Sequence, residues 1–468
     1  MTVRHSPGLQ TGLRSVIPMH SVGNWPSRRL GDLLEAIIDY RGKTPPKAAS
    51  GIATLTAANV RNGRLDLSNL SYISQDTYEK WTTRGLPEPG DVLITTEAPI
   101  GEVASFPCDG KYLITRRLMA LRGRHGELDN QFLKYMLMSR PVRQALLSAE
   151  RGSTVPRILK TDVTNLKVPI PDVTIQRRLA HILGTLDDKI ELNRRMNRTL
   201  EAIARAIFKS WFVDFDPVID NAILNGKPIP DEFADRAEAR REILAQDIGD
   251  EGVAGYRHLF PDRFQDSPLG KIPKGWTIKA LDEIAGFING AACQKYAAEP
   301  GEPSLPVVKI RELGQGVTLQ SDRARLDIPE KHQADDGDVL FSWSGTLLCK
   351  IWTGGPCFVN QHIFKVTSAS FPKWFYLLWI NRHLEAFRGV AAGKATTMGH
   401  IKRTHLSEAL VVVPESSLLA EMSNVLAPIV EAATRTELEA RELAAWRDAL
   451  LPQLLSGAIL LGDEGEPA

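Results

Sequence analysis

The sequence predicts two mixed α/β domains in a pseudo-twofold arrangement, separated by a long antiparallel two-helix coiled coil. Three observations support this fold class. The chain has 468 residues, enough for two to four domains. One α/β pattern occurs twice, and each copy precedes a long segment with heptad spacing. Apolar residues make up 43% and charged residues 24%, which excludes a disordered, collagenous or disulfide-scaffold protein.

The repeat consists of elements that recur in the same order at a nearly constant offset. Gly90-Asp91-Val92-Leu93 recurs as Gly337-Asp338-Val339-Leu340, and a helix-like run from Phe132 matches one from Trp374. The stretch that ends at Pro171 matches the stretch that ends at Pro414. Because both order and spacing agree, we interpret the chain as a duplicated unit.

Each copy is expected to hold short strands followed by one amphipathic helix, since apolar runs alternate with turn signals. The expected strands are Asp91–Thr95 and Leu113–Leu121 in the first copy, and Asp338–Ser342 and Phe358–Val366 in the second. The expected helices cover residues 130–148 and 372–389.

After each copy, apolar residues recur at alternating spacings of three and four, as in a coiled coil. Asn193 and Asn197 take two seam positions, where asparagine costs stability but can fix the register. The other positions of the first seam are Leu183, Leu186, Ile190, Leu200, Ala204, Ile207 and Trp211. The second seam holds Leu426, Ile429, Ala433, Thr436, Ala440, Leu443, Leu450 and Leu454. We expect the two helices to pair with each other rather than to pack on separate cores.

These patterns divide the chain into seven segments. They are an N-terminal extension (1–25), a first α/β domain (26–171), a central helix (172–215), a linker (216–270), a second α/β domain (271–414), a distal helix (415–460) and a C-terminal tail (461–468). The linker is expected to be mainly a connector, with a helix near Asp235–Ala245.

Charge is distributed unevenly although the formal net charge is only +1. Residues 26–171 hold 21 Lys and Arg against 15 Asp and Glu, and residues 271–414 hold 17 against 13. The linker and the C-terminal region are acidic. Two basic blocks alternating with acidic ones fit a nucleic-acid-binding protein that is neutral as a whole.

Four scattered cysteines and the lack of an apolar signal-peptide core predict a reduced, cytoplasmic chain. No apolar run approaches the ~18 residues that span a bilayer, so no membrane segment is expected.

The motifs indicate no catalytic centre. Gly42-Lys43-Thr44 resembles the end of a phosphate-binding loop, but position 37 is Ile where that loop needs Gly. The Asp/Asn-Pro-Pro-aromatic motif of amino methylation is absent from the sequence. Asp172 with Asp187-Asp188-Lys189 fits the spacing of a metal-dependent nuclease. The second half of that pattern lies in the predicted coiled coil, so we interpret these charges as a solvated helix face.

Both basic blocks instead place cations, amides and hydroxyls on turn-like stretches. Arg and Lys read guanine edges or hold phosphates, and Asn and Gln read adenine. The candidates in the first copy are Arg41, Lys43, Asn59, Arg61, Thr95, Thr96, Arg116, Arg117, Thr154, Arg157 and Lys160. Those in the second copy are Lys309, Arg311, Ser342, Trp343, Ser344, Gln361, His362, Lys394, Thr396, Thr397, His400 and Lys402. The clusters near Gly152–Lys160 and Gly393–Arg403 occupy matching positions in the repeat.

This layout resembles the specificity subunit of type I restriction-modification systems. The most specific similarity is ILGTLDDKIELNRRMNRTLEAIARAIFKSWFVDFDPV, Ile182 to Val218, which looks like the family's central conserved helix. The run from His258 to Trp276 resembles the start of the second recognition domain. GDVL in both copies and LLPQLLSGAI near the C-terminus also fit. The second helix lacks the FxxWF-like end of the first, and residues 1–24 have no assigned role.

The resemblance implies a non-catalytic, sequence-specific DNA-binding subunit. Each α/β unit would be a target recognition domain for one half of a bipartite double-stranded target, and the helices would set the spacer. Two modification subunits would dock on the helices, with Phe208, Trp211, Phe212, Leu451 and Leu455 as docking candidates. This chain would bind no metal or cofactor. S-adenosylmethionine, ATP and Mg would belong to the modification and restriction (translocase) subunits.

Two other function classes remain open on the sequence. One is a self-contained nuclease or methyltransferase acting on DNA, and the other is a scaffold protein with no nucleic-acid role.

Overall fold

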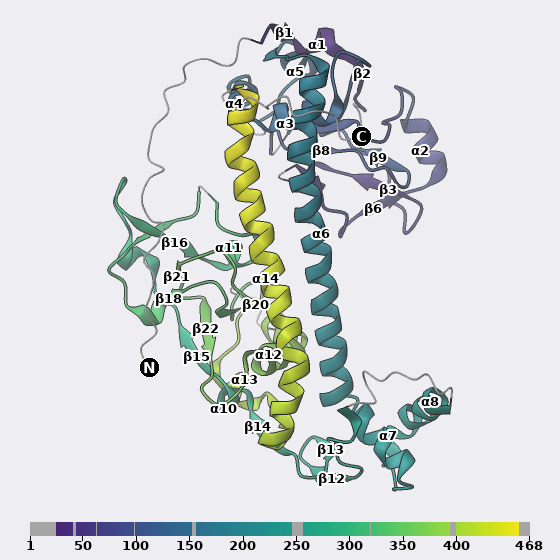
Figure 1. Ribbon diagram of the computed structural model, residues 1–468, viewed down its shortest axis with the longest axis vertical. Helices are drawn as coiled ribbons and strands as arrows, with labels where there is room; N and C mark the ends of the chain where they lie inside the picture. The colour runs from purple at the N-terminus through teal and green to yellow at the C-terminus, as the bar shows by residue number, and fades with distance from the viewer. Residues whose placement is uncertain are drawn as a thin grey trace, which may run out of the picture. The chain divides into compact units, whose positions relative to one another are not determined.

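The computed structural model describes residues 25–40, 44–61, 63–97, 99–151, 156–245, 256–318, 320–393 and 399–457. The chain divides into two compact units, unit 1 (residues 1–189 and 443–468) and unit 2 (residues 190–442). Both contain sheets and helices, and a 40-residue helix follows the first set of strands (Figure 1). The predicted mixed α/β fold class is therefore confirmed.

Unit 1 is built on an antiparallel sheet of four strands. Its elements are β1 (Ser27–Arg29), α1 (Leu30–Leu33), β2 (Leu34–Ile38), β3 (Ile52–Leu55), β4 (Val60–Arg61), β5 (Arg64–Leu65), β6 (Ser71–Ile73), α2 (Gln75–Trp81), β7 (Val92–Thr95), β8 (Val103–Ser105), β9 (Tyr112–Ile114), β10 (Leu118–Gly123), α3 (Asn130–Met138), α4 (Arg140–Ser148), α5 (Lys160–Thr164) and β11 (Lys167–Pro169). The main sheet has the order β2-β10-β7-β8. A second sheet, β6-β3-β9, contains a parallel pair, and β1 pairs with β11 near the end of the domain.

Unit 2 repeats this topology. Its elements are α7 (Asp216–Leu224), α8 (Ala234–Ala245), β12 (Phe264–Ser267), β13 (Gly270–Pro273), β14 (Thr277–Ala280), α10 (Leu281–Ile284), β15 (Gly286–Asn289), β16 (Ser304–Val308), α11 (Ile310–Gln315), β17 (Arg323–Arg325), β18 (Gln333–Ala334), β19 (Val339–Ser342), β20 (Cys349–Ile351), β21 (Cys357–Val359), β22 (Ile363–Thr367), α12 (Lys373–Ala392), α13 (Arg403–Glu408) and β23 (Leu410–Val413). The main sheet β15-β22-β19-β20 matches that of unit 1 strand for strand. The parallel pair recurs as β16 with β21, and β14 pairs with β23.

In each unit, one stretch that was predicted to be a single strand forms two strands. Residues 113–121 divide into β9 and β10, because a turn in which the Leu118 amide donates to the Thr115 carbonyl (2.9 Å) separates them. Residues 358–366 divide in the same way into β21 and β22, where the Ile363 amide donates to the Asn360 carbonyl (3.0 Å). In both units the two strands belong to different sheets. The turns therefore carry the chain from one sheet to the other.

The predicted helix 130–148 is interrupted, whereas the predicted helix 372–389 is continuous as α12. α3 ends at Met138 and α4 begins at Arg140, one residue before Pro141. Proline lacks an amide hydrogen and is favoured in the first turn of a helix, so it marks a new helix here.

α6 (Val173–Phe212) and α14 (Ser416–Leu455) each contain 40 residues and contact each other within both units. In unit 1, Asp187 pairs with Arg447 (2.7 Å), and Leu183 shares a hydrophobic cluster with Leu451. In unit 2, Asn197 donates to Glu437 (3.1 Å). In unit 1, residues earlier in α6 thus meet residues later in α14, which is antiparallel packing. None of the described helices has the length and apolarity of a membrane span.

The segment predicted as a connector, 216–270, is more ordered than expected. Asp216 and Asp220 lie one turn apart on α7 and are ion-paired with Arg236 (2.6 Å) and Arg240 (2.5 Å), one turn apart on α8. Buried apolar residues such as Val218 attach α7 to the core of unit 2. The acidic charge of this segment is thus partly neutralised inside a folded helix pair.

Candidate nucleic-acid interface

The first feature of the interface is a loop anchored by a buried hydroxyl. β7 ends at Thr95, whose hydroxyl donates to the Pro99 carbonyl and accepts from the Glu102 amide (2.9 Å). β19 ends at Ser342, whose hydroxyl donates to the Thr346 carbonyl (2.7 Å) and accepts from the Leu348 amide (2.9 Å). Both hydroxyl residues are fully buried, so they shape the loops from inside.

The same three segments meet beside this loop in both units. In unit 1 the Thr96 amide donates to the Arg117 carbonyl (2.9 Å), and the Thr96 carbonyl accepts from the Ile158 amide (3.0 Å). In unit 2, Trp343 makes the equivalent bonds to His362 (3.2 Å) and Ile401 (3.0 Å).

We call these arrangements loop cluster 1 and loop cluster 2. Loop cluster 1 contains Thr96, Glu97, Arg116, Arg117, Arg157 and Lys160. Loop cluster 2 contains Trp343, Ser344, Gln361, His362, His400 and Lys402. Thr96 corresponds to Trp343, Arg117 to His362 and Arg157 to His400. The structure thus brings together candidates that are up to 64 residues apart in the first copy.

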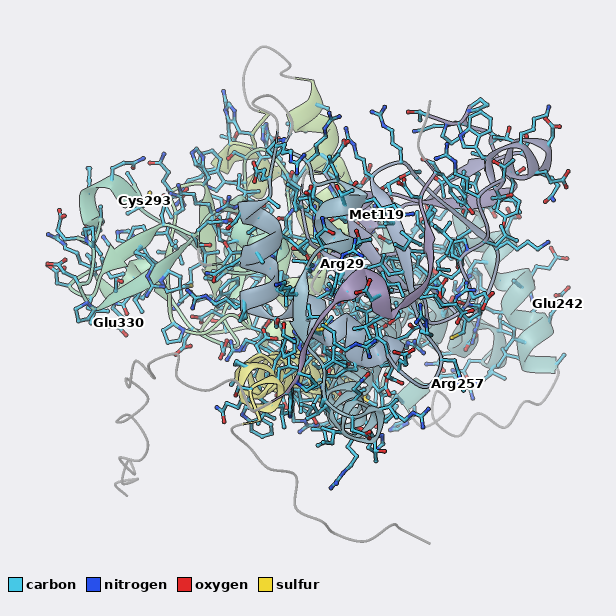
Figure 2. All side chains as sticks on the ribbon, turned by 90° about the horizontal axis from the view of Figure 1, so that it is seen from above. Arg29, Met119, Glu242, Arg257, Cys293 and Glu330 are labelled. Carbon is cyan, nitrogen blue, oxygen red and sulfur yellow. The ribbon has the colours of Figure 1, made fainter. Side chains whose placement is uncertain are left out.

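Loop cluster 1 surrounds a cavity of about 240 Å³ that is rich in charge. Its lining residues are Asp39, Thr96, Glu97, Arg116, Met119, Arg157, Ile158, Leu159 and Lys160. Figure 2 labels one of these lining residues, Met119 on β10. Glu97 is ion-paired with Arg117 (3.0 Å). Arg116, Arg157 and Lys160 are exposed, and no described residue makes an ion pair with their side chains. Loop cluster 1 therefore offers three cations to an anionic ligand.

Loop cluster 2 has a different chemistry at the equivalent positions. The Ser344 hydroxyl lies 3.0 Å from Nδ1 of His362, and the Trp343 ring lies 5.6 Å from the His362 ring and 6.3 Å from that of His400. Gln361 is exposed beside His362. The Trp343 indole N–H is buried without a hydrogen-bond partner among the described residues. Aromatic rings and neutral hydrogen-bonding groups thus replace most of the cations.

Asp187 is not part of a solvated helix face, contrary to the prediction. Its carboxylate accepts from Lys134 (2.8 Å), Tyr135 (2.7 Å) and Arg447 (2.7 Å) inside unit 1. Burial alone would raise the pKa of Asp187, but the two cations outweigh it and hold the pKa below its ordinary value. The carboxylate is therefore a structural group that connects α3, α6 and α14. No group of His, Cys, Asp or Glu among the described residues is arranged to hold a metal ion.

Comparison with known proteins shows which family this chain resembles. Residues 23–202 match the type I restriction modification DNA specificity domain. The HindI specificity subunit of Haemophilus influenzae is 25% identical, over 74% of this chain and 81% of its own length. The MjaIX specificity subunit of Methanocaldococcus jannaschii is 23% identical, over 84% and 85%. The chain is therefore similar to type I restriction-modification specificity subunits over most of its length, and its first part matches their DNA specificity domain. The resemblance predicted from the sequence is thus confirmed.

The fold of this chain also occurs in a solved structure. The S subunit of a type I restriction-modification system from M. genitalium aligns with a TM-score of 0.50 at 14% sequence identity, covering 94% of this chain and 97% of that one. At this identity the similarity concerns the fold alone.

The remaining predicted DNA-binding residues of this chain fall into three groups. Asn59 is buried, and its amide nitrogen donates to the Asp66 carbonyl (2.9 Å). Arg61 is exposed on β4, while Lys309 and Arg311 are ion-paired with Asp322 and Glu312. The residues outside the described ranges are Arg41, Lys43, Thr154, Lys394, Thr396 and Thr397.

The predicted docking residues are packed inside the units. Phe208, Trp211 and Phe212 belong to the core of unit 2, where the Phe212 ring lies 5.5 Å from that of Trp276. Leu451 and Leu455 belong to the core of unit 1. These five side chains are therefore not presented on a surface.

A different set of apolar residues is exposed on α6. Leu192 is 52% exposed, Met196 46% and Ile203 42%. The signal in the sequence is that these three residues lie off the predicted seam, where a solvated helix would carry polar side chains.

Proposed function

We propose that this specificity subunit reads a bipartite double-stranded DNA sequence, one half with each loop cluster, and catalyses no reaction itself. The observation that carries the proposal is the recurrence of the same three-segment arrangement after β7 and after β19. In both clusters, side chains suited to base edges and phosphates stand on a backbone that is fixed by hydrogen bonds.

The two half-sequences should differ, because the two clusters differ in chemistry. Arg116, Arg157 and Lys160 suit guanine edges and phosphates, and the Glu97 carboxylate can accept from the amino group of cytosine. Gln361 and His362 offer neutral groups of the kind that pair with adenine edges. An asymmetric target follows from this difference.

We further propose that α6 and α14 set the gap between the half-sites and dock two modification subunits. The docking contact is expected on the exposed face of α6 formed by Leu192, Met196 and Ile203, since the five residues first considered are buried. An exposed apolar strip on a helix is typical of a protein-binding surface.

In this proposal the modification and restriction subunits, not this chain, carry out the catalysis. S-adenosylmethionine, ATP and Mg are expected to bind to the modification and restriction subunits, and the complex is expected to work in the cytoplasm on DNA. The sequence supports this division, because it lacks the amino-methylation motif. The nuclease-like pattern also has its Asp187 carboxylate committed to Lys134 and Arg447.

The proposal is tested by incubating a pool of random DNA duplexes with the chain, alone and co-expressed with a modification subunit, and sequencing the retained DNA. Retention of a two-part sequence is expected with the complex. Methylation or cleavage by the chain alone would favour a self-contained enzyme. Failure to retain DNA even with the partner would favour a scaffold.

A further inference from the structure

The seam of the helix pair in unit 2 contains a buried polar layer. Asn193 is only 1% exposed, and its Nδ2 has no hydrogen-bond partner among the described residues. One turn further along α6, Asn197 donates to Glu437 (3.1 Å), while its Oδ1 is buried and also without a described partner. Burying such groups costs stability. Favourable packing therefore does not explain why asparagines occupy these two buried positions.

The facing part of α14 is the small-residue part of its seam. Ala433, Thr436 and Ala440 are all buried around Glu437, and the Thr436 hydroxyl is already bonded to the Ala433 carbonyl (2.9 Å). Larger apolar residues lie on either side, namely Ile429 and Val430 before this stretch and Leu443 after it. The asparagine side chains thus face the part of α14 where the side chains are smallest.

If α6 shifted by one heptad along α14, Asn197 would no longer lie opposite these small residues. The shift would place Val430 or Ala444, instead of Glu437, opposite Asn197 and break the one hydrogen bond that the layer makes across the helices. Asn197 would then lie beside Ile429 or Leu443, with its amide unpaired in an apolar part of the seam. A single polar seam residue is known to select one register of a coiled coil at a cost in stability.

We infer that Asn193 and Asn197 fix the register of α6 against α14 and thereby the spacer length that the protein accepts. They are positioning residues, and the inference rests on the proposed function of the helix pair. One heptad corresponds to ~10.5 Å of helix, or about three base pairs of DNA. A shift of one heptad also breaks the Asp187–Arg447 ion pair, so without the layer spacers about three base pairs longer or shorter should be better tolerated but still weaker than the native spacer.

The test uses the double variant Asn193→Leu/Asn197→Leu in complex with the modification subunit. Its melting temperature is expected to rise by a few degrees, roughly 2–4 °C, because unpaired buried amides are removed. Its preference for the native spacer over one changed by three base pairs is expected to fall at least about tenfold. Binding is measured with duplexes whose spacers differ by up to four base pairs. Asn424→Leu, which replaces an exposed asparagine on α14, is the matched control and should change neither quantity.

Three outcomes are distinguishable. A higher melting temperature with weaker spacer selection supports the inference. Unchanged spacer selection in the variant overturns it, as does a lower melting temperature of Asn193→Leu alone, which would mean that the amide has a partner. A wild-type complex without any preferred spacer would instead refute the proposed function itself.

Discussion

Arg157 and Lys402 are exposed residues on loops whose backbone is fixed by hydrogen bonds to nearby segments. The Arg157 backbone exchanges hydrogen bonds with Arg151 (3.0 Å both ways), and the Lys402 amide donates to His405 (3.0 Å). A cationic side chain can read a base or hold a phosphate when its backbone is fixed and its charged end forms no ion pair with the described residues. Replacing such a side chain should change DNA binding without unfolding the domain.

We expect Arg157→Ala to weaken recognition of one half-site by about 10- to 100-fold, which corresponds to the ~1–3 kcal/mol of one good base contact. Lys402→Ala should weaken the other half-site. Binding of duplexes with either half-site scrambled separates the two effects. Arg140→Ala, an exposed arginine on α4 outside both clusters, is the control. Loss of both half-sites in one variant would contradict independent recognition.

For single residues, the sequence predicted which side chains are exposed better than it predicted what each side chain does. The repeat places Arg157 at the position of His400, two residues before Lys402, and both Arg157 and Lys402 prove to be exposed. Thr95 and Ser342 are also polar, yet their hydroxyls are already hydrogen-bonded to backbone groups of the loops that follow them. A one-dimensional pattern does not distinguish a hydroxyl that faces outward from one that closes a turn.

Among the elements, α6 shows both what a heptad pattern predicts and what it misses. The predicted seam residues Leu183, Ile190 and Ala204 are buried. The seam of α14 predicted no residue between Leu443 and Leu450, and Arg447 occupies that gap, 8% exposed. Hydrophobic periodicity does not predict the burial of Arg447, because its buried partner Asp187 lies on α6, far away in the sequence.

Replacing Asp187 with Asn should destabilise unit 1 by ~3–5 kcal/mol, because Lys134 would remain buried without its counter-charge and Arg447 would keep only the exposed Asp448. Urea unfolding at pH 7 measures the difference. The adjacent exposed residue provides the control, Asp188→Asn, for which little change is expected. Equal stability of Asp187→Asn and the wild type would show that the ion network contributes nothing.

The same network predicts the direction of an acid dependence. The pKa of Asp187 is lower in the folded protein than its ordinary value of about 3.9, so its stabilisation is present above that value. The stabilisation is lost as the pH falls through the folded-state pKa. The difference in unfolding free energy between wild type and Asp187→Asn should therefore shrink as the pH falls below about 4. A difference that grows on acidification would contradict this sign.

The exposed face of α6 predicts a second effect at the scale of elements. Ile203→Glu should weaken binding of the modification subunit at least about tenfold, since it places a charge within an apolar contact. Co-purification and titration calorimetry measure this loss. Leu224→Glu changes a leucine that is 60% exposed on α7 and should leave the complex intact. Equal weakening by both variants would indicate a general effect of charge.

For the whole molecule, the duplication was visible in the sequence and is present in the strand order of both units. GDVL leads into the equivalent strands β7 and β19. The helix predicted near Asp235–Ala245 is confirmed as α8, but its pairing with α7 was not predicted, because that pairing depends on two Arg–Asp contacts between residues 20 positions apart. The transfer of the chain between sheets at residues 115–117 was also missed, since a three-residue turn leaves little trace in an apolar run.

The ruler proposal predicts the effect of shortening both helices together. Deleting one heptad from each, residues 190–196 and 438–444, retains Asn197 and Glu437 and removes ~10.5 Å of helix. The preferred spacer should shorten by about three base pairs while both half-sequences stay the same. Binding to a spacer series measures the change. An unaltered spacer would mean that the helices do not set the distance.

The most direct test of the central claim is to sequence the modified bases in the genome of cells that express this chain with a modification subunit. Two different short half-sequences, separated by a gap of constant length and unspecified sequence, are the predicted result. A single uninterrupted motif, or half-sequences at variable distances, would contradict the assignment of one half-site to each loop cluster.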